Sequence, residues 1–247
     1  MSCPSALQCL EKGFPAQIKI GATTTVSDNE GQAVSVCSAT IHPSNNMDAM
    51  ENDIAILKLC DPISITAYGQ YNRDADYPGA TGVDVYIHGF GRTDVYGDLS
   101  PILQKAKIDY LDNPTCAARY NKYNGDQTFC ADSPTSAICY GDSGGPVTDV
   151  EGLVVGLNSY IVDTCASSYP DFFVRLSSYA SWLDEMICEQ AIDKPEWCAD
   201  IVSSSGTGVE GDDDEAQDDD DVGGIADSIA ECLSLLLGLM SNILGGR

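Results

Sequence analysis

A glycine-rich octapeptide carries the residues best suited to chemistry: Cys139-Tyr140-Gly141-Asp142-Ser143-Gly144-Gly145-Pro146. Gly141 has no Cβ, so the backbone can approach a substrate closely. The N–H groups of Gly141 and Ser143 can then point at one spot and bind a developing oxyanion. This spacing predicts Ser143 as a nucleophile and the two amides as an oxyanion hole. The alternative is a glycine-rich turn with an ordinary surface serine.

Short strands must position this loop. Apolar runs with period-two alternation, separated by turn signals such as residues 28–31 and 74–79, predict strands at 18–20, 33–36, 53–59, 83–90, 102–110 and 152–157. Regularly spaced short strands are typical of an all-β sandwich or barrel. One helix closes the unit, because an apolar face recurs at helical spacing over 179–187. Ser177 or Ser178 is placed to cap that helix.

Composition limits the classes of function. The 247 residues suit one or two domains, and the net charge of −26 argues against nucleic acid or an anionic membrane as partner. Eleven cysteines predict disulfides and an oxidising compartment, so we expect a secreted protein. An odd count leaves one thiol free or one partner outside this chain. With only two histidines, no metal site and no cofactor are expected. Residues 1–4 do not begin the basic and then apolar stretch of a secretory signal, and we expect that signal to precede the given N-terminus.

The composition changes after Cys198. Residues 199–224 combine a Ser/Gly linker with nine acids between 210 and 221, which predicts a disordered acidic tail. Residues 225–247 form an apolar segment that polar residues interrupt, and it is shorter than a clean spanning helix needs. Two alternatives to a plain extension are a lipid-anchor signal and membrane contact through 225–244.

The nucleophile loop resembles that of trypsin- and chymotrypsin-like serine peptidases, and the resemblance extends over residues 5 to about 187. Asp53–Leu59 is similar to the family's strand that carries the catalytic aspartate, and Gly89–Thr93 to its Gly-Trp-Gly-Arg segment, with Phe90 for tryptophan. Ser159–Ile161 resembles the segment that pairs with substrate backbone. The resemblance implies a double β-barrel over 1–190, with the first barrel incomplete, a C-terminal helix, and hydrolysis of peptide bonds in polypeptide substrates.

The resemblance also implies residue roles. Asp53 would orient an imidazole, Ser159 would hydrogen-bond Asp53, and Asp142 matches the acid that pairs with a new N-terminal amine after zymogen cleavage. It implies the disulfides Cys116–Cys130 and Cys139–Cys165. We also expect Cys37–Cys60 and Cys188–Cys198, because each pair flanks a strand pair or a short loop.

One departure concerns the catalytic base. Gln8, in Ser5-Ala6-Leu7-Gln8-Cys9, stands where the family has the histidine of Thr-Ala-Ala-His-Cys, and glutamine accepts no proton at neutral pH. His42 and His88 do not match the base position. Two hypotheses stay open: an N-terminally incomplete member of an active peptidase, or a non-catalytic homologue that acts as a protein-binding or inhibitory protein.

The specificity pocket rests on three positions carried over from the resemblance. Ala137 falls at the pocket base, where trypsin-like members have aspartate, and Ile161 narrows the entry as in elastase-like members. Asp171 lies across the pocket floor and would supply a carboxylate for a basic side chain. Alternatively, Asp171 is a solvated loop acid. These features conflict, so they leave the preferred substrate side chain open.

Overall fold

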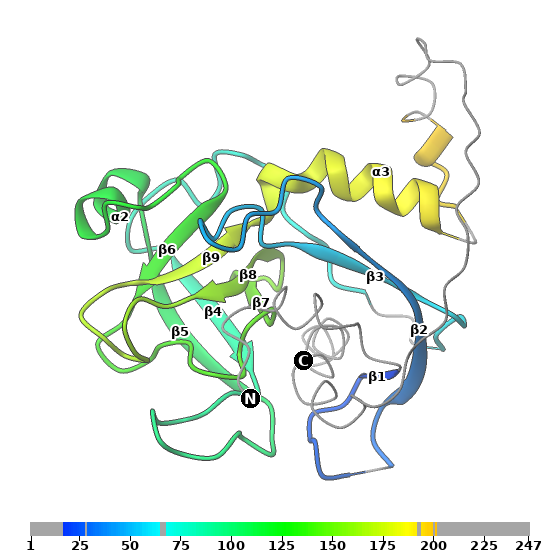
Figure 1. Ribbon diagram of the computed structural model, residues 1–247, viewed down its shortest axis with the longest axis horizontal. Helices are drawn as coiled ribbons and strands as arrows, with labels where there is room; N and C mark the ends of the chain where they lie inside the picture. The colour runs from blue at the N-terminus through cyan, green and yellow to red at the C-terminus, as the bar shows by residue number, and fades with distance from the viewer. Residues whose placement is uncertain (1–16, 28, 65–67, 192–193, 200, 202–247) are drawn as a thin grey trace.

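A computed structural model describes residues 17–201 except 28, 65–67, 192–193 and 200, and shows two separate β-sheets (Figure 1). The first sheet contains β1 (Gln17–Ile20), β2 (Gln32–Ile41) and β3 (Ala55–Leu59). The second is a closed barrel in the order β4-β5-β6-β9-β8-β7. Its strands are β4 (Asp84–Gly89), β5 (Gln104–Leu111), β6 (Thr128–Asp132), β7 (Pro146–Thr148), β8 (Val154–Tyr160) and β9 (Asp171–Arg175).

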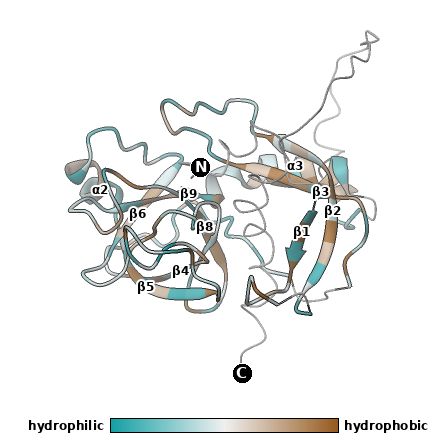
Figure 2. Ribbon diagram, turned by 60° about the horizontal axis from the view of Figure 1, so that its bottom comes forward, coloured by the Kyte–Doolittle hydropathy of each residue, from teal (hydrophilic) through white to brown (hydrophobic). Residues whose placement is uncertain are grey.

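The first sheet is antiparallel throughout, with Ile18 opposite Val34 and Thr40 opposite Ile56. Its buried side chains alternate along β1 and β2, because successive residues of a strand point to opposite faces. A small cluster of Ile18, Ile20, Val34 and Val36 results. All five residues of β3 are only half-buried. Figure 2 shows the hydrophobic stretch of β3 close to α3 (Ala180–Gln190).

The barrel contains the larger core. Phe129 on β6 and Phe173 on β9 stack with ring centroids 5.1 Å apart, and both rings are fully buried. Each remaining strand adds at least one fully or nearly fully buried side chain, namely Val85, Ile108, Val147 and Val155. Closure leaves this sheet with no free edge, so every strand hydrogen-bonds on both sides.

Two helices flank the barrel. α2 (Asn113–Arg119) begins after Asp112, whose carboxylate accepts a hydrogen bond from Thr115 N at 2.8 Å. α3 follows a 3₁₀ turn, η1 (Leu176–Tyr179), and extends from the barrel toward the first sheet (Figure 1). The predicted serine cap of α3 is wrong. No side chain caps this helix, and Ser178 instead donates its hydroxyl hydrogen bond to Asp126 O at 2.6 Å.

The architecture is mostly β, with one closed six-stranded barrel, a partial second sheet and a C-terminal helix, which is consistent with the chymotrypsin fold. Four disulfides join the described residues in the pairs named from the sequence: Cys37–Cys60, Cys116–Cys130, Cys139–Cys165 and Cys188–Cys198. Gln8 and most of the acidic and apolar tail (202–247) lie outside the described residues. Within those residues, no helix has the length and apolar character needed to cross a membrane.

Candidate active site

The nucleophile loop lies between Cys139 and the start of β7. Gly141 has a φ of +95°, and a Cβ there would lie 2.5 Å from Leu99 Cδ2 and 3.2 Å from Gly91 Cα. Only glycine satisfies both the backbone angle and the space. Among the described residues, neither the Gly141 amide nor the Ser143 amide donates a hydrogen bond. Both amides are therefore available to a ligand oxygen beside the half-buried Ser143.

Asn158 holds this loop against β8. Its backbone carbonyl accepts from Gly144 N at 2.7 Å, and its backbone N donates to Gly145 O at 2.8 Å. Its side-chain amide donates to Asp142 O at 2.9 Å and to His88 O at 3.1 Å. Asn158 was not predicted from the sequence, although an amide side chain directly after the apolar start of β8 is the signal that would have identified it.

Asp53 lies just before β3 and is 8% exposed. Ser159, the residue after Asn158, donates its hydroxyl hydrogen bond to Asp53 Oδ2 at 2.5 Å. The neighbouring Asn52 is anchored to the rest of the molecule, because its backbone N donates to Gln127 Oε1 at 3.0 Å and its side chain accepts from Tyr179 Oη at 3.3 Å. Contacts of Asp53 and Asn52 with β8, with the 3₁₀ turn η1 and with the segment before β6 therefore fix the position of Asp53.

These contacts connect Asp53 and Ser143, the two candidate catalytic residues that the structure describes. Asp53 binds Ser159, the adjacent Asn158 binds Gly144, and Gly144 follows Ser143. Asp53 and Ser143 are 90 positions apart in the chain. The C-terminal part of β8 brings them together, because it contacts Asp53 through Ser159 and the loop of Ser143 through Asn158. Gln8, which occupies the predicted base position, lies outside the described residues.

Asp142 is a carboxylate turned inward beneath the loop. Its Oδ1 accepts from Gly91 N at 2.8 Å and its Oδ2 from Cys139 N at 2.9 Å. Burial raises the pKa of this carboxyl, and the two amide hydrogen bonds oppose that effect. A cavity of about 370 Å³ adjoins Asp142, with Gly91, Arg92 and Gln104 among its lining residues. This cavity has room for a further group beside the carboxylate.

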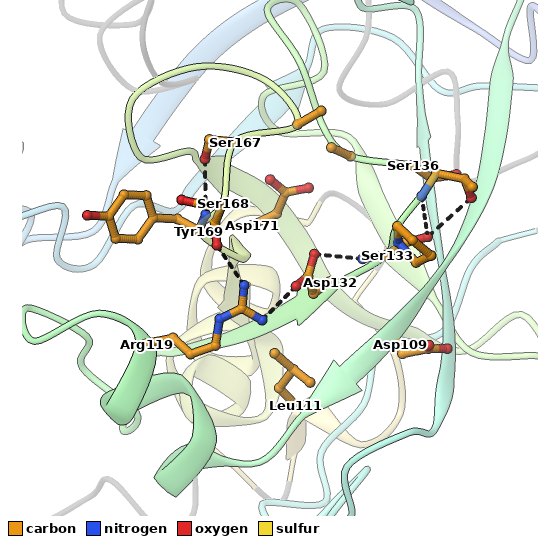
Figure 3. Close-up of a pocket in the computed structure, with 14 residues that line it drawn as sticks. Asp109, Leu111, Arg119, Asp132, Ser133, Ser136, Ser167, Ser168, Tyr169 and Asp171 are labelled. Atoms are coloured by element: carbon orange, nitrogen blue, oxygen red, sulfur yellow. Dashed lines mark hydrogen bonds and ion pairs between the residues drawn. The ribbon is translucent and has the colours of Figure 1, made fainter.

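The three predicted pocket residues lie on different elements. Ala137 precedes the nucleophile loop, Ile161 follows β8 and packs against the barrel core, and Asp171 is the first residue of β9. Asp171 is not a solvated loop acid, since it is 7% exposed and its Oδ2 accepts from Ile138 N at 2.7 Å. Ala137 and Asp171 both line a cavity of about 600 Å³ (Figure 3), and Ile161 is not among its lining residues.

Neither described histidine is placed as a base. His88 lies buried in the barrel with Nε2 3.0 Å from Thr148 Oγ1, and burial lowers its pKa to about 4. His42 packs its ring against Tyr179 and Trp182, and its Nδ1 accepts from Ser44 N at 3.2 Å. Across the described residues, no group of three or more His, Cys, Asp or Glu side chains could hold a metal ion.

A glycine-rich loop that carries Ser143 at a closed barrel, with a buried aspartate just before a strand of a second sheet, is the arrangement expected of a serine-peptidase-like protein of the chymotrypsin type. Residues 5–183 match the family model described as Trypsin, so the chain belongs to the trypsin family. The resemblance inferred from the nucleophile loop is thus confirmed.

Three relatives illustrate the similarity. A fibrinolytic enzyme, isozyme C, of Lumbricus rubellus is 34% identical over 205 residues, which cover 74% of this chain and 84% of the relative. A trypsin of Sarcophaga bullata is 30% identical, covering 73% of each chain. The chymotrypsin-like elastase family member 1 of Bos taurus is also 30% identical, covering 74% of each chain.

Proposed function

We propose that the chain carries the acyl-transfer site of a serine endopeptidase, with Ser143 as nucleophile, Asp53 as the orienting acid, and the amides of Gly141 and Ser143 as oxyanion hole. The observation that carries this proposal is the hydrogen-bonded connection from Asp53 through Ser159 and Asn158 to the loop of Ser143. A binding role alone requires neither a buried aspartate at that position nor two amides beside a serine that have no hydrogen-bond acceptor within the described part of the chain.

The proposed reaction begins with attack of Ser143 Oγ on the carbonyl carbon of a peptide bond. The oxygen becomes an oxyanion, which the two amides stabilise, and collapse of the intermediate releases the amine and leaves an acyl-serine that water hydrolyses. Both halves need a base that takes the hydroxyl proton and returns it to the leaving amine. Gln8 has no such basicity, so the chain as written should be inactive or nearly so. Losing one triad member costs about 10⁴ to 10⁶ in turnover.

A second candidate function is a non-catalytic homologue that binds or inhibits another protein, and Gln8 is the observation that favours it. Both candidates take a polypeptide in the same place. In both, Ala137, Ile161 and Asp171 would form the pocket for one side chain of that polypeptide. The four disulfides support a secreted chain in either case.

Asp142 would serve as the acid that responds to zymogen cleavage. Its buried carboxylate and the adjoining cavity of about 370 Å³ support this role, because an α-amine bound there would neutralise the buried charge. The carboxylate already accepts hydrogen bonds from Gly91 N and Cys139 N, and Asp142 directly follows Gly141. An amine on Asp142 would therefore act on the geometry of the oxyanion hole.

The proposal is tested by restoring the base. The purified 1–247 chain and its Gln8→His variant are treated with a fluorophosphonate probe, which labels an activated serine. We expect slow labelling of the original chain and rapid labelling of Gln8→His at Ser143. Gln8→His combined with Ser143→Ala is the site control, and Gln8→His combined with Asp53→Asn should label far more slowly.

Two results would contradict the proposal. Rapid stoichiometric labelling of the original chain would show that a base other than residue 8 acts on Ser143. Labelling of Gln8→His no faster than that of the original chain would favour the non-catalytic homologue.

A further inference from the structure

The side chain of Asn158 lies beneath the nucleophile loop, where it meets two backbone carbonyls. Asn158 is on β8 and is only 2% exposed. Its Nδ2 donates to Asp142 O at 2.9 Å and to His88 O at 3.1 Å, so both N–H bonds of the amide are used. Carbonyl oxygens only accept hydrogen bonds, so the nitrogen of the amide, and not its oxygen, must face these two partners.

The oxygen of the same amide is left without a partner. Asn158 Oδ1 is buried and has no hydrogen-bond partner among the residues that the structure describes. A buried acceptor in this state destabilises the folded protein. An apolar side chain of the same shape would fill the space without that cost, so packing alone does not account for an amide here. The contribution of Asn158 therefore lies in the two carbonyls that it holds.

One of these carbonyls belongs to the same peptide unit as the Ser143 amide. The bond between Asp142 and Ser143 is trans, and in a trans peptide the C=O and the N–H lie in one plane and point in opposite directions. Asn158 holds Asp142 O on the buried side of the loop. The Ser143 N–H must then point away from Asn158, to the side where it meets no acceptor within the described part of the chain.

The loop does not fix the direction of this peptide unit by itself. Gly141 and Gly144 on either side of it have φ values of +95° and +79°, and glycine adopts a wide range of backbone angles. Gly145 N also donates to Asp142 O at 3.0 Å, but this donor belongs to the same loop and moves with it. The Asn158 amide instead connects the carbonyl to a strand of the closed barrel.

The second proposed oxyanion donor is held by a different contact. The Gly141 amide shares a peptide unit with Tyr140 O, which accepts a hydrogen bond from Arg92 N at 2.9 Å. The two amides are thus directed from behind by separate donors. Loss of the Asn158 amide should disturb the Ser143 N–H and leave the Gly141 N–H in place.

We propose that Asn158 is a positioning residue for the oxyanion hole: its side-chain amide holds Asp142 O and thereby aims the Ser143 N–H at the substrate oxygen. This inference rests on the proposed function, because it assumes that the Ser143 N–H meets an oxyanion. Asn158 acts only through the peptide unit between Asp142 and Ser143. Its loss should therefore slow the acylation of Ser143 more than the loss of an equally buried core side chain.

Amide NMR on the 1–247 chain tests the positioning without any need for catalysis. Asn158→Leu keeps a side chain of similar size and removes both donors. We expect the Ser143 amide resonance to shift and broaden in Asn158→Leu, because the peptide unit exchanges between orientations, while the Gly141 resonance keeps its position. Val155→Ala, which removes buried volume from the same strand, should leave both resonances in place. An unchanged Ser143 resonance in Asn158→Leu would overturn the inference.

Probe labelling in the Gln8→His background measures the effect on acylation. Removal of one oxyanion donor costs about 10² to 10³ in rate, so a misdirected Ser143 N–H should slow the labelling of Asn158→Leu about 100-fold. Val155→Ala should be labelled at the rate of the Gln8→His parent, although it unfolds at a lower urea concentration. Equal labelling of Asn158→Leu and the parent would overturn the inference.

Asn158→Asp is the conservative comparison in the same background. Its carboxyl donates one hydrogen bond when protonated and none when ionised. At pH 6 it should be labelled faster than Asn158→Leu, and its rate relative to the parent should fall as the pH rises to 8.5. Labelling of Asn158→Asp no faster than that of Asn158→Leu at pH 6 would contradict a role for the donated hydrogen bond.

The two measurements separate this inference from the proposed function. A disturbed Ser143 amide in Asn158→Leu, without labelling of Gln8→His, would support the positioning by Asn158 and contradict the catalytic proposal. Rapid labelling of Gln8→His that Asn158→Leu leaves unchanged would support the acyl-transfer site and overturn the role of Asn158.

Discussion

Replacement of Asp171 by asparagine should stabilise the protein at alkaline pH. The folded state raises the pKa of Asp171 from its ordinary value of 3.8 to about 7, chiefly through burial. At a pH between 3.8 and about 7, the folded state binds more protons at Asp171 than the unfolded state does. The contribution of Asp171 to the free energy of unfolding therefore falls as the pH rises. Above pH 7 the loss is complete. Asparagine has no charge to bury and retains the acceptor for Ile138 N.

The size of the effect follows from the pKa difference. A difference of one in pKa corresponds to about 1.4 kcal/mol, so ionisation of Asp171 should cost about 3 kcal/mol between pH 4.5 and 8.5. Water that enters the cavity of about 600 Å³ would solvate the carboxylate and reduce that cost. The expectation is that Asp171→Asn gains stability relative to the original chain by about 2 to 3 kcal/mol as the pH rises through this range.

Urea unfolding at pH 4.5, 6 and 8.5 measures this quantity for both proteins. The stability difference between them is compared across pH, because the other carboxylates titrate in both proteins and cancel. A stability difference between the two proteins that stays constant with pH would refute the reasoning. A difference that shifts in favour of the original chain as the pH rises from 4.5 to 8.5 would also refute it.

Three further outcomes are expected. Gly156→Ala should lower the free energy of unfolding by about 3 kcal/mol in urea titrations, because its Cβ would lie 2.4 Å from Phe129 Cε1; an unchanged midpoint would contradict the packing. Ser159→Ala should slow probe labelling of Gln8→His, because it removes the hydroxyl hydrogen bond to Asp53; equal labelling rates would count against positioning by Ser159. Hydrogen exchange should be slow over 84–175 and faster over 17–59; uniform protection would contradict this.

The elements with strong local patterns could be predicted from the sequence. The alternating run at 83–90 corresponds to β4 (Asp84–Gly89), and the helical face at 179–187 corresponds to α3 (Ala180–Gln190). The nucleophile loop was identifiable because its glycines and serine are adjacent in the chain. Each of these signals is local, and local signals are the ones that a sequence displays directly.

The elements that depend on distant partners were missed. β6, β7 and β9 were not predicted from the sequence. Four successive residues of β6 and all five of β9 are buried, so their side chains show no polar–apolar alternation to detect. The burial of Asp171 has the same origin. Its surroundings come from β6, which pairs with β9 at Ala131, and from the segment of Ile138. No residue next to Asp171 in sequence indicates those neighbours.

The wrong prediction of a serine cap for α3 has a related cause. Ser177 and Ser178 satisfy the sequence rule for a helix N-terminus, but a 3₁₀ turn continues the helical path through Tyr179 and moves the start of α3 to Ala180. The hydroxyl of Ser178 then bonds Asp126 O, and Tyr179 contacts Asn52 next to the candidate catalytic acid. A tertiary hydrogen bond has replaced a local one.

The two sheets contribute unequally to the site. Ser143, the amides proposed as the oxyanion hole and Asp171 lie on the segments that form the closed barrel, whereas Asp53 lies just before β3 of the smaller sheet. Asp53 and its neighbour Asn52 bind Ser159, Gln127 and Tyr179, so local opening of the three-stranded sheet would break these bonds without opening the barrel. Probe labelling of Gln8→His should therefore be lost at lower urea concentration than the amide protection of residues 84–175. Simultaneous loss of both would show that the two sheets open as one cooperative unit.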